Sequence, residues 1–480
     1  MSRPGPTLNE HLCVILGLVI DGYEKALRVG NAFLLVDGTD ETVVRVAEIA
    51  VFPNRSQSRQ LDRLLDLVRE AYNAALQERR DAWRLRGHTV QLFDQFAQIT
   101  ELRELRPEIK TFGIQPIRGA LRRVDHAFSA FFRRCSAGDK PGYPRFKSRS
   151  RYRSIDYDEP ASWRLSGLAS ERPRIYVQGI GDVRLGRKGV RQLRRLSERG
   201  GEPRTLRLVK GPSGHGWHAF VSFRNVAVQE ISAPSEQIGG IDRGIANTIA
   251  LPDGTLVSMP RFLDEARAEI AELQHRRALV KPGSSQCRLL SRRIAKAHRK
   301  AKNQSINWAR HLAAELVERY GVIVLEKLEL ANMTRSAKGT IERPGHNVAQ
   351  KSGLSRSLQE AALSRLAYCI CVKAEGAGRR VWAVPAKDSS RQCAACGHTE
   401  KANRPSQAEF FCLSCGHRQH ADVNAAQVIT ARGAAAETAW LAKGCPVRSR
   451  PQPRLRRRRT DNSGEGVTGA GSAPHAELVA

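Results

Sequence analysis

Four cysteines near the end of the chain have the spacing of a metal site. Cys393 and Cys396 form one C-x2-C pair, fifteen residues follow, and Cys412 and Cys415 form a second pair. A structural zinc site takes four tetrahedral ligands, and each C-x-x-C turn supplies two converging sulfurs. Four thiolates leave no open position for a substrate. The sequence therefore predicts one structural Zn²⁺, with a redox or disulfide role as the alternative.

Three acidic residues interrupt segments that otherwise have buried character. Asp242 breaks the apolar strand pattern "IGGIDRGIA", Glu326 ends "GVIVLE", and Asp422 opens the helix "DVNAAQVI". A carboxylate on a buried strand is costly unless it is paired or bound to a metal. Carboxylates from two adjacent strands and a facing helix can hold two Mg²⁺ ions, which clamp the attacking water and leaving oxygen of a phosphodiester. The ordinary alternatives are a turn residue, an ion-pair partner and a helix N-cap, respectively.

The chain is long and strongly basic. Its 480 residues include 79 Lys and Arg against 48 Asp and Glu, which gives a formal net charge of +31. Seven of the arginines lie in residues 448–459, so most of the excess is spread through the rest of the chain. An excess of this size indicates a polyanionic partner, most commonly nucleic acid, and a solvated basic surface is the alternative.

One basic segment, residues 139–154, alternates cations with aromatic rings. Pro141 and Pro144 favour an extended backbone there. Cations can neutralise phosphates while rings stack on bases, as single-stranded nucleic acid requires. An ordinary basic loop is the alternative. The residues predicted to contact nucleic acid are Tyr143, Arg145, Phe146, Lys147 and Arg149.

The cysteine content and the apolar runs indicate where the protein resides. Ten cysteines, four of them in zinc spacing, are typical of a reducing cytoplasm and not of a disulfide scaffold. The longest apolar run, residues 11–20, is too short to span a bilayer and lacks the flanks of a signal peptide. We therefore expect a soluble, intracellular protein with no membrane partner.

The first half of the chain combines strands with two amphipathic helices. Residues 1–41 are weakly patterned, and an alternating strand pattern begins at Val43. The helices predicted from apolar periodicity cover residues 61–83 and 117–134. Phe128, Phe131 and Phe132 on the second helix are predicted to be core, with a base-stacking platform as the alternative. Short strands separated by glycines, typical of a small barrel or sheet, are predicted within 174–185, 205–211 and 216–228.

The second half alternates strands with helices. From Gly239, the pattern predicts a strand hairpin with a "PDG" turn, a basic helix and a buried Val/Ile/Leu strand. Another helix and strand follow before the cysteines. After Gly433 the sequence has low complexity, which favours disorder. The helices are predicted at 288–320 and 353–378, and the strands at 321–330 and 379–386.

In this order, the motifs resemble those of the TnpB family. The matching stretches are "GGIDRGIANTIALPDG", "VIVLEKLELANM", "CAACGH…FFCLSCGH" and "ADVNAA", together with the N-terminal "FPN…Q…YNAAL" and "GYPRFKSR". TnpB proteins are transposon-encoded, RNA-guided DNA endonucleases related to the miniature type V CRISPR effectors. The resemblance runs from about residue 43 to about residue 432. It implies cleavage of double-stranded DNA that is complementary to a guide RNA and lies next to a short flanking motif.

The resemblance implies roles for individual residues. Asp242, Glu326 and Asp422 match the three RuvC acids, and the four cysteines match the zinc segment that binds target nucleic acid. Asn424 matches the family's D-x-N-A-A signature. Arg404 resembles an arginine that reaches the scissile phosphate. Two residues depart from the pattern, because Arg243 replaces a common apolar residue and Lys327 replaces a small polar or acidic one.

The implied architecture is multidomain α+β. A wedge-like β-barrel carries an inserted helical recognition domain, and a RuvC nuclease domain of RNase H fold with a zinc-binding insertion follows. The expected parts are an extension (1–42), the barrel (43–55 and 139–235), the recognition domain (56–138), the nuclease domain (236–386 and 420–435), the insertion (387–419) and a basic tail (436–480).

Other functions remain open at this point. One alternative is a nuclease-silent RNA-guided DNA-binding protein, and others are an RNase H-fold DNA transposase and a zinc-ribbon binding module. The sequence leaves open whether the guide comes from a transposon end or a CRISPR array, which motif is read, and whether the chain acts as a monomer or a homodimer. The implied location is the bacterial cytoplasm, with action at the nucleoid.

Overall fold

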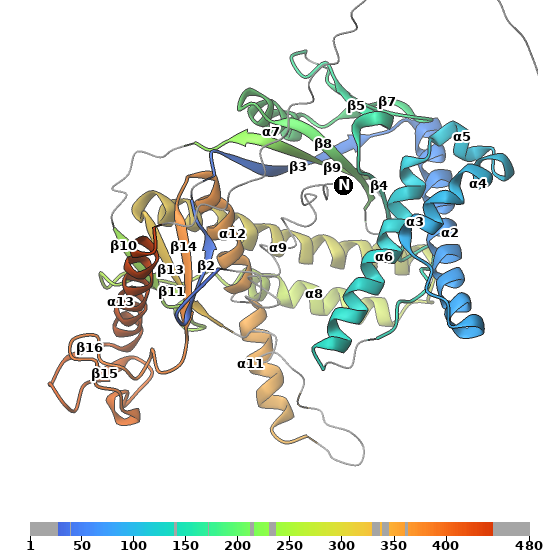
Figure 1. The fold of residues 1–480 in the computed structure, drawn as a ribbon. Coiled ribbons are helices and arrows are strands. Elements are labelled where there is room, and N and C mark those ends of the chain that lie inside the picture. Colours follow the sequence, from blue (N-terminus) through green and yellow to red (C-terminus); the bar gives the residue numbers. More distant parts are fainter. Residues whose placement is uncertain are drawn as a thin grey trace, which may run out of the picture.

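The computed structural model describes residues 27–38, 40–138, 142–170, 172–211, 216–229, 237–328, 337, 345–360 and 363–444. Within these ranges the chain forms two lobes, one around a seven-stranded sheet and one around a five-stranded sheet (Figure 1). The basic run 448–459 and most of the linker at 231–237 lie outside the described residues.

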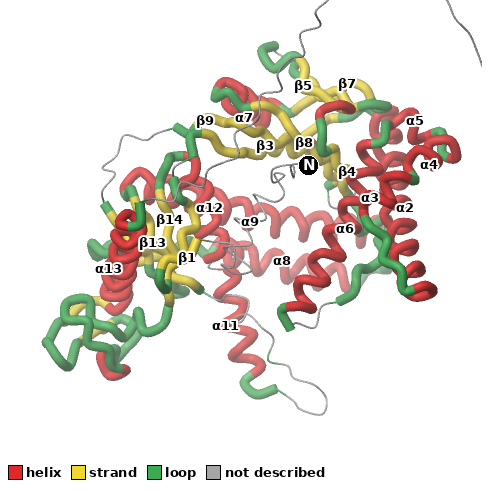
Figure 2. Tube along the Cα trace, in the orientation of Figure 1, coloured by secondary structure: helices red, strands yellow, loops and turns green. Residues whose placement is uncertain are grey.

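The larger sheet is antiparallel and curves into a nearly closed, barrel-like shape (Figure 2). The strand expected from Val43 and the strands expected between residues 174 and 228 are confirmed. A basic helix, α7 (Arg187–Glu198), was not predicted, and it packs on β3 through Val190 and Leu193. In pairing order the strands are β4 (Ser154–Tyr157), β8 (Glu202–Lys210), β9 (Trp217–Ala227), β3 (Thr42–Phe52), β7 (Gly181–Leu185), β6 (Arg174–Val177) and β5 (Trp163–Ser166), with η1 (Pro160–Ser162) before β5.

A group of helices is inserted between β3 and β4. The first, α2, begins with a capping box in which Asn54 and Gln57 each accept the other's backbone N–H, and it buries the predicted apolar stripe. The aromatic stripe of the last helix is only partly core, because Phe128 is buried but Phe132 is 57% exposed. That part of the prediction is wrong. The helices are α2 (Arg55–Arg86), α3 (Leu92–Ala97), α4 (Ile99–Leu105), α5 (Glu108–Phe112) and α6 (Gln115–Ser136).

The smaller sheet contains the two strands that lead to Asp242 and Glu326. Strands β14, β13 and β10 are parallel to one another, and β2 runs antiparallel to β14. β1 and β2 come from the stretch that was set apart as an extension, so residues 27–36 instead complete this sheet. The Gly30-Asn31 turn between them is a hairpin signal that the sequence analysis missed. In order the strands are β1 (Leu27–Val29), β2 (Ala32–Val36), β14 (Arg380–Pro385), β13 (Val322–Lys327) and β10 (Ile238–Ile241).

Helices cover both faces of this sheet (Figure 1). On one face, α9 (Ser285–Arg319) and α12 (Leu363–Gly376) pack against Ile323 and Leu325. On the other face, α13 (Ala421–Ala442) packs against Val322 and Val324. The remaining helices of this lobe are α8 (Phe262–Ala278), which packs on α9, and α11 (Val348–Glu360). Among the described residues, no helix combines the length and apolar character of a membrane span.

α13 approaches the sheet so closely that glycine is required at the contact. A Cβ at Gly240 would lie 2.4 Å from the backbone nitrogen of Thr430, and a Cβ at Gly433 would lie 2.1 Å from Val324 Cγ2. The freed space allows the Gly240 N–H to donate to Thr430 Oγ1 at 2.8 Å. These contacts fix the helix that carries Asp422 against the strand that leads to Asp242.

α13 also continues to Ala442, past residue 435, where the tail was expected to begin. Alanine is the strongest helix former, so an alanine-rich stretch of low complexity can still be ordered. Trp440 packs edge-on against Trp382 with ring centroids 6.4 Å apart. Glu437 accepts a hydrogen bond from Trp382 Nε1 at 2.6 Å. The expected boundary at residue 435 is therefore wrong.

Two small hairpins complete the lobe. β11 (Ile249–Ala250) and β12 (Leu256–Val257) follow β10 and are joined through the expected "PDG" turn, where Gly254 has a φ of +96°. β15 (Glu409–Phe411) and β16 (Arg418–His420) lie in the cysteine segment, together with the short helix η3 (Lys401–Asn403). β16 runs directly into α13, so the cysteine segment is continuous with that helix.

Candidate active site and metal centre

Asp242 and Glu326 lie at the carboxyl ends of two adjacent parallel strands. β10 and β13 pair with Ile241 opposite Leu325, so the next residues, Asp242 and Glu326, follow in the same register. Neighbouring strands lie about 4.8 Å apart, and residues in register point to the same face. That face is the one covered by α13, because Val324 faces α13 and strand residues alternate. The backbone of Asp242 is held by its bridge to Ala250.

Asp422 reaches the same region from the first turn of α13. It is not the N-cap, which was the ordinary alternative: His420 is the N-cap, and its Nδ1 accepts the Asp422 N–H at 3.2 Å. The carboxylate is instead held at both oxygens. Asn247 Nδ2 donates to Oδ2 at 3.1 Å, and Arg404 Nη2 lies 3.0 Å from Oδ1.

The three acids influence one another's protonation. Burial, followed by the charges of Glu326 and Asp422, raises the pKa of Asp242 to about 7, whereas Arg404 and Arg243 oppose the rise. Burial also raises the pKa of Glu326, against a hydrogen bond from Ser389 Oγ. Because Asp242 ionises near pH 3.8 in the unfolded chain, its raised pKa makes the folded state progressively less stable as the pH rises from about 4 to about 7.

This donor set fits a hard divalent cation. Mg²⁺ prefers carboxylate oxygens, and a bound cation would offset the burial and the repulsion that together raise the Asp242 pKa. The fit is one of residue type and charge. Among the described residues, only the cysteine group discussed below brings three or more His, Cys, Asp or Glu ligand atoms within 4.8 Å of one another. The three carboxylates are therefore neighbours at a wider spacing.

Arg243 and Lys327, the two residues that depart from the family pattern, lie on the face of the sheet opposite the three acids. Lys327 follows Glu326 and so points away from it, with its Nζ 4.6 Å from the centre of the Phe33 ring. Arg243 is 6% exposed, and its guanidinium donates to the backbone carbonyls of Glu326 and Leu363. Lys327 is thus positioned away from the acids, whereas Arg243 braces the strand that carries one of them.

We expect Arg243→Met to destabilise the protein. The substitution leaves two buried carbonyls without their donor and removes a positive charge beside Asp242 and Glu326. The free energy of unfolding in urea at pH 7 should fall by about 2–4 kcal/mol. Lys327→Met is the matched control on the same face, and its effect should stay below about 1 kcal/mol. Equal stability of the Arg243 variant and the wild type would contradict this bracing role.

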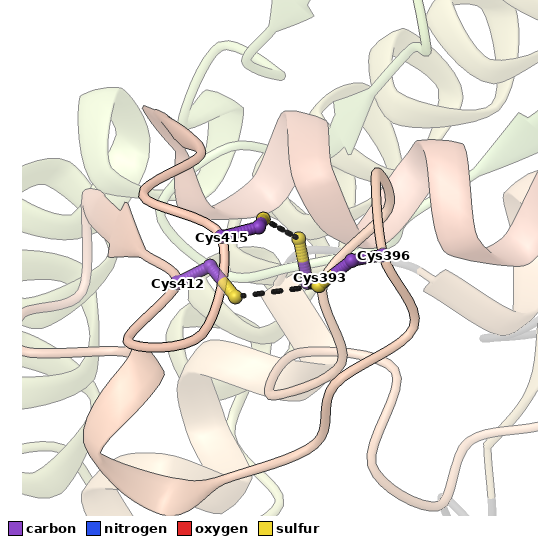
Figure 3. Close-up of side chains that lie close together, drawn as sticks. All are labelled: Cys393, Cys396, Cys412 and Cys415. Carbon is purple, nitrogen blue, oxygen red and sulfur yellow. Dashed lines mark hydrogen bonds between the residues drawn. The ribbon is translucent and has the colours of Figure 1, made fainter.

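The four cysteines converge as their spacing predicts (Figure 3). The sulfurs of Cys393 and Cys415 are 3.7 Å apart, and those of Cys396 and Cys412 are 3.6 Å apart. Disulfide sulfurs would lie about 2.05 Å apart. In contrast, a tetrahedron of sulfurs about 2.3 Å from a zinc ion has edges of about 3.8 Å. The observed distances fit a four-thiolate metal site.

Both cysteine turns have the same backbone design. The N–H of Gly397 donates to Cys393 O, and the N–H of Gly416 donates to Cys412 O, each at 2.9 Å. Both glycines have φ above +70°, a conformation that favours glycine. The Cys-Gly step in each "C-x-x-C-G-H" therefore lets the chain turn tightly behind the sulfurs, as predicted.

Asn424 connects the cysteine segment to the helix that carries Asp422. It is fully buried, its Oδ1 accepts the Ala394 N–H at 2.9 Å, and its Nδ2 donates to Gln392 O at 2.7 Å. The Ala421 N–H also donates to Ala408 O at 2.8 Å. The first cysteine turn and the first turn of α13 are thus bound to each other.

Arg404 lies on the loop between the two cysteine pairs. Its Nη2 contacts Asp422 and also donates to Gln407 O at 2.8 Å. The guanidinium is part-buried, with 24% of the side chain exposed. It therefore braces its own loop and also contacts one of the three acids.

The sequence analysis missed two polar side chains at the acids. Asn247, which holds Asp422, lies in the loop after β10, and Ser389, which donates to Glu326 Oε1, follows β14. Both lie just beyond the carboxyl ends of parallel strands. Polar residues at these positions are the signal that could have identified them, because such ends meet at one edge of a sheet.

The basic segment near residue 145 packs against the inserted helices of the other lobe, through Asn73 of α2 and Phe128 of α6. Its backbone is anchored at Lys147, whose N–H and carbonyl both bond to the Asn73 side chain. Arg149 pairs with Asp66 at 2.7 Å. Tyr143, Arg145 and Phe146 are exposed, and Tyr143 packs edge-on against Phe128 of α6.

Comparison with known families identifies three segments. Residues 47–88 match the helix-turn-helix domain of OrfB_IS605, residues 224–337 match the OrfB_IS605 "probable transposase" model, and residues 364–429 match the "Cas12f1-like, TNB domain". The last match spans the cysteine segment and the start of α13.

Whole proteins give a consistent result. A putative RNA-guided DNA endonuclease, InsQ of Escherichia coli, is 28% identical over 70% of this chain and 79% of its own length. A putative RNA-guided DNA endonuclease of Streptomyces pristinaespiralis is 26% identical over 82% of this chain and 91% of its own. The endodeoxyribonuclease Cas12f1 of Sulfoacidibacillus thermotolerans is 40% identical over 16% of this chain and 18% of its own.

The fold matches that of a miniature effector. Cas12f1 in its complex with guide RNA and target DNA aligns with a TM-score of 0.52 at 12% identity, covering 82% of this chain and 99% of that one. The two lobes therefore have the Cas12f-like fold. The OrfB_IS605 matches and these relatives agree with the resemblance to the TnpB family that the sequence motifs carry.

Proposed function

We propose that this protein is an RNA-guided DNA endonuclease that cleaves double-stranded DNA next to a short flanking motif. The observation that carries the proposal is the meeting of Asp242, Glu326 and Asp422 on one face of the five-stranded sheet, from two adjacent parallel strands and the helix that covers them. This is the arrangement expected of a RuvC site of RNase H fold. The names of the relatives support the same activity.

The proposed domains follow the expected division with two changes. The barrel-like sheet is the wedge domain, and α2–α6 form the recognition domain inserted into it. The five-stranded lobe is the RuvC domain, and it gains β1 and β2 at one edge and α13 as far as Ala442. The segment between β14 and α13 is the insertion that binds target nucleic acid.

Asp242, Glu326 and Asp422 would hold two Mg²⁺ ions. When bound, these ions supply Lewis-acid stabilisation and an activated water for phosphodiester hydrolysis. The chain's own contribution is to orient the ligands: Asn247 and Arg404 hold Asp422, and Ser389 holds Glu326. The raised pKa of Asp242 is consistent with ligands that are arranged for a cation and repel one another without it.

The four cysteines would hold one structural Zn²⁺. Structural zinc contributes directly to folding, because its site does not exist in the unfolded chain. Through Asn424, the same ion would stabilise the first turn of α13. The zinc segment is thus proposed to position Asp422 as well as a nucleic-acid strand.

Guide RNA and target DNA are the proposed partners. The formal net charge of +31 favours binding of such polyanions. Base pairing with the guide would supply the sequence specificity. The exposed Tyr143, Arg145 and Phe146 stay proposed contacts of this kind. Action at the bacterial nucleoid follows from the same proposal.

Arg404→Lys is expected to slow cleavage by roughly tenfold or more, because lysine keeps the charge but loses the guanidinium fork that can donate to two phosphate oxygens. Zinc content and guided DNA binding should not change. Arg418→Lys, at an exposed ion pair in the same insertion, is the control and should cut normally. Zinc loss in the Arg404 variant, with the remaining folded fraction cutting at the normal rate, would assign Arg404 a bracing role only.

Sequencing the RNA that co-purifies with the protein from its native locus tests the proposal. A defined RNA species, joined to a variable segment that matches DNA, is the expected result. A protein that joins DNA ends and carries no defined RNA would instead be a transposase, as the name of one matching family model suggests. A defined RNA with guided binding but no cutting would indicate the nuclease-silent alternative.

A further inference from the structure

The chain leaves β14 through a tight turn that is strained immediately before Ser389. Asp388 has a φ of +60°, in the left-handed region that is uncommon for residues other than glycine. The N–H groups of Arg391 and Gln392 both donate to Asp388 O and close the turn. A strained residue persists only where its surroundings hold it, and such residues cluster at functional sites. The contacts that hold this turn therefore point to a functional role.

The turn directs the Ser389 side chain at one of the three acids. Ser389 is 3% exposed, and its Oγ donates to Glu326 Oε1. A serine hydroxyl has one proton, so this bond engages one carboxylate oxygen. Within the described ranges, no protein group donates to the second oxygen, Oε2. The position of Ser389 therefore decides which oxygen of Glu326 stays available to a cation.

Arg432 of α13 holds this turn through three hydrogen bonds. Its Nη1 donates to Pro385 O at 2.7 Å and to Lys387 O at 2.9 Å, and its Nη2 donates to Gln392 Oε1 at 2.7 Å. The acceptors lie before and after the strained residue in the chain, so both sides of the turn are held. A guanidinium presents its donors in a rigid plane, which suits several acceptors at a set geometry.

The charge of Arg432 and its hydrogen bonds have opposite effects on a cation at the acids. Arg432 lies near enough to Glu326 for its positive charge to oppose the rise that burial causes in the Glu326 pKa. That charge also repels a cation, so its removal alone would tighten metal binding. Loss of the three hydrogen bonds would weaken metal binding, because Ser389 would no longer fix one orientation of Glu326. The sign of the change in metal affinity therefore separates the two roles.

We propose that Arg432 is a positioning residue of the nuclease site and acts on Glu326 through the turn and Ser389. This rests on the proposed function, in which Glu326 is a Mg²⁺ ligand. α13 then positions two of the three acids, because it carries Asp422 in its first turn and holds Glu326 through Arg432 nearer its other end. One helix thereby fixes the spacing of two ligands that come from distant parts of the chain.

The test measures Mn²⁺ binding to the full-length protein, freed of nucleic acid, by electron paramagnetic resonance. Mn²⁺ takes the same oxygen ligands as Mg²⁺, and Glu326→Gln defines the binding that does not involve the acids. Above that level, Arg432→Met should raise the Mn²⁺ Kd roughly tenfold or more, as is typical when a residue behind a metal ligand is lost. Arg432→Lys keeps the charge but not the fork and should raise the Kd about threefold or more. It provides the test if the Met variant does not fold.

A double-mutant cycle tests whether Arg432 acts through Ser389. Ser389→Ala should itself raise the Mn²⁺ Kd roughly tenfold. If the two residues act in one chain of contacts, the Kd of the double variant should stay within about threefold of the single variants. Independent effects would instead multiply to roughly a hundredfold.

Arg380→Met is the matched control. Arg380 also joins β14 to α13, through an ion pair with Glu437 at 2.6 Å, but it lies at the end of β14 away from Glu326, which pairs with Val384. Its loss should lower the melting temperature, as the loss of Arg432 should. The Mn²⁺ Kd of the Arg380 variant should nevertheless stay within about twofold of the wild type, because the site is distant.

The outcomes separate this proposal from the proposed function. Unchanged or tighter Mn²⁺ binding by the Arg432 variants, beside a wild type that binds Mn²⁺ at the acids, would overturn the positioning role alone. Multiplying effects in the double variant would also overturn it, because Arg432 would then not act through Ser389. If the wild type binds no more Mn²⁺ than Glu326→Gln and cuts no guided DNA, the proposed function itself fails.

Discussion

Asp242→Asn, Glu326→Gln and Asp422→Asn should each reduce DNA cleavage by roughly a thousandfold or more while guided DNA binding stays nearly unchanged. Each substitution keeps the shape of the side chain and removes a charged oxygen ligand, and metal-dependent hydrolysis depends on those ligands. Cleavage of a matched plasmid and a gel-shift assay with the same DNA measure the two effects separately. Asp253→Asn is the control, because Asp253 is an acid of the same lobe that pairs with Arg319 at the surface.

Asp242→Asn should also stabilise the metal-free protein. In the folded chain the pKa of Asp242 is raised to about 7, so at pH 8 the wild type carries a crowded, buried charge that asparagine lacks. At pH 4 the carboxyl is largely protonated, and the gain should disappear. Melting temperatures at the two pH values in the presence of EDTA measure this difference.

For the cleavage prediction, full cutting by any of the three acid variants would show that the replaced residue is not part of the active site.

Cys412→Ser should have the second large effect. Loss of one thiolate opens the four-sulfur site, so bound zinc should fall from about one ion per chain to nearly none. Cleavage should drop by roughly a hundredfold or more through misplacement of Asp422 and Arg404, since both depend on the folded segment. Amide hydrogen exchange should increase at Ala394 and Ala421, whose N–H groups bond across the junction with α13.

Cys287→Ser is the matched control for this prediction. Cys287 lies on α9, outside the sulfur cluster, and is half-buried. Its replacement should leave zinc content and cleavage as they are in the wild type. Metal analysis that finds no zinc in the purified wild type would contradict the structural-zinc assignment. Normal cutting by a zinc-free Cys412 variant would contradict the link between the insertion and Asp422.

The four cysteines and the strand acids could be singled out from the sequence because each lies in a recognisable local pattern. A few adjacent residues determine the shape of each Cys-x-x-Cys turn, and one bound ion would bring the two turns together. Asp242 and Glu326 stood out because each follows an apolar strand, where an acid is costly without a partner. That the two strands are adjacent and in register depends on the whole sheet, and only the structure shows it.

The elements that were missed depend on tertiary contacts. β1 and β2 are short strands that become stable by adding to the edge of a formed sheet, and no long periodic pattern marks them. The end of α13 has an alanine-rich sequence without a strong pattern, and its order depends on the packing of Trp440 against Trp382. Asn247 and Ser389 each lie far along the chain from the acid they hold, so their roles appear only in three dimensions.

Programmed cleavage is the most direct test of the central claim. The protein is loaded with the co-purified RNA, re-synthesised with a new guide segment, and mixed in Mg²⁺ with a pool of plasmids that carry the matching target beside randomised flanking sequence. A second pool carries a scrambled target. Cutting confined to the matching pool, limited to one short flanking motif and absent with EDTA, is the predicted result. Equal cutting of both pools, or no cutting of either, would contradict an RNA-guided nuclease.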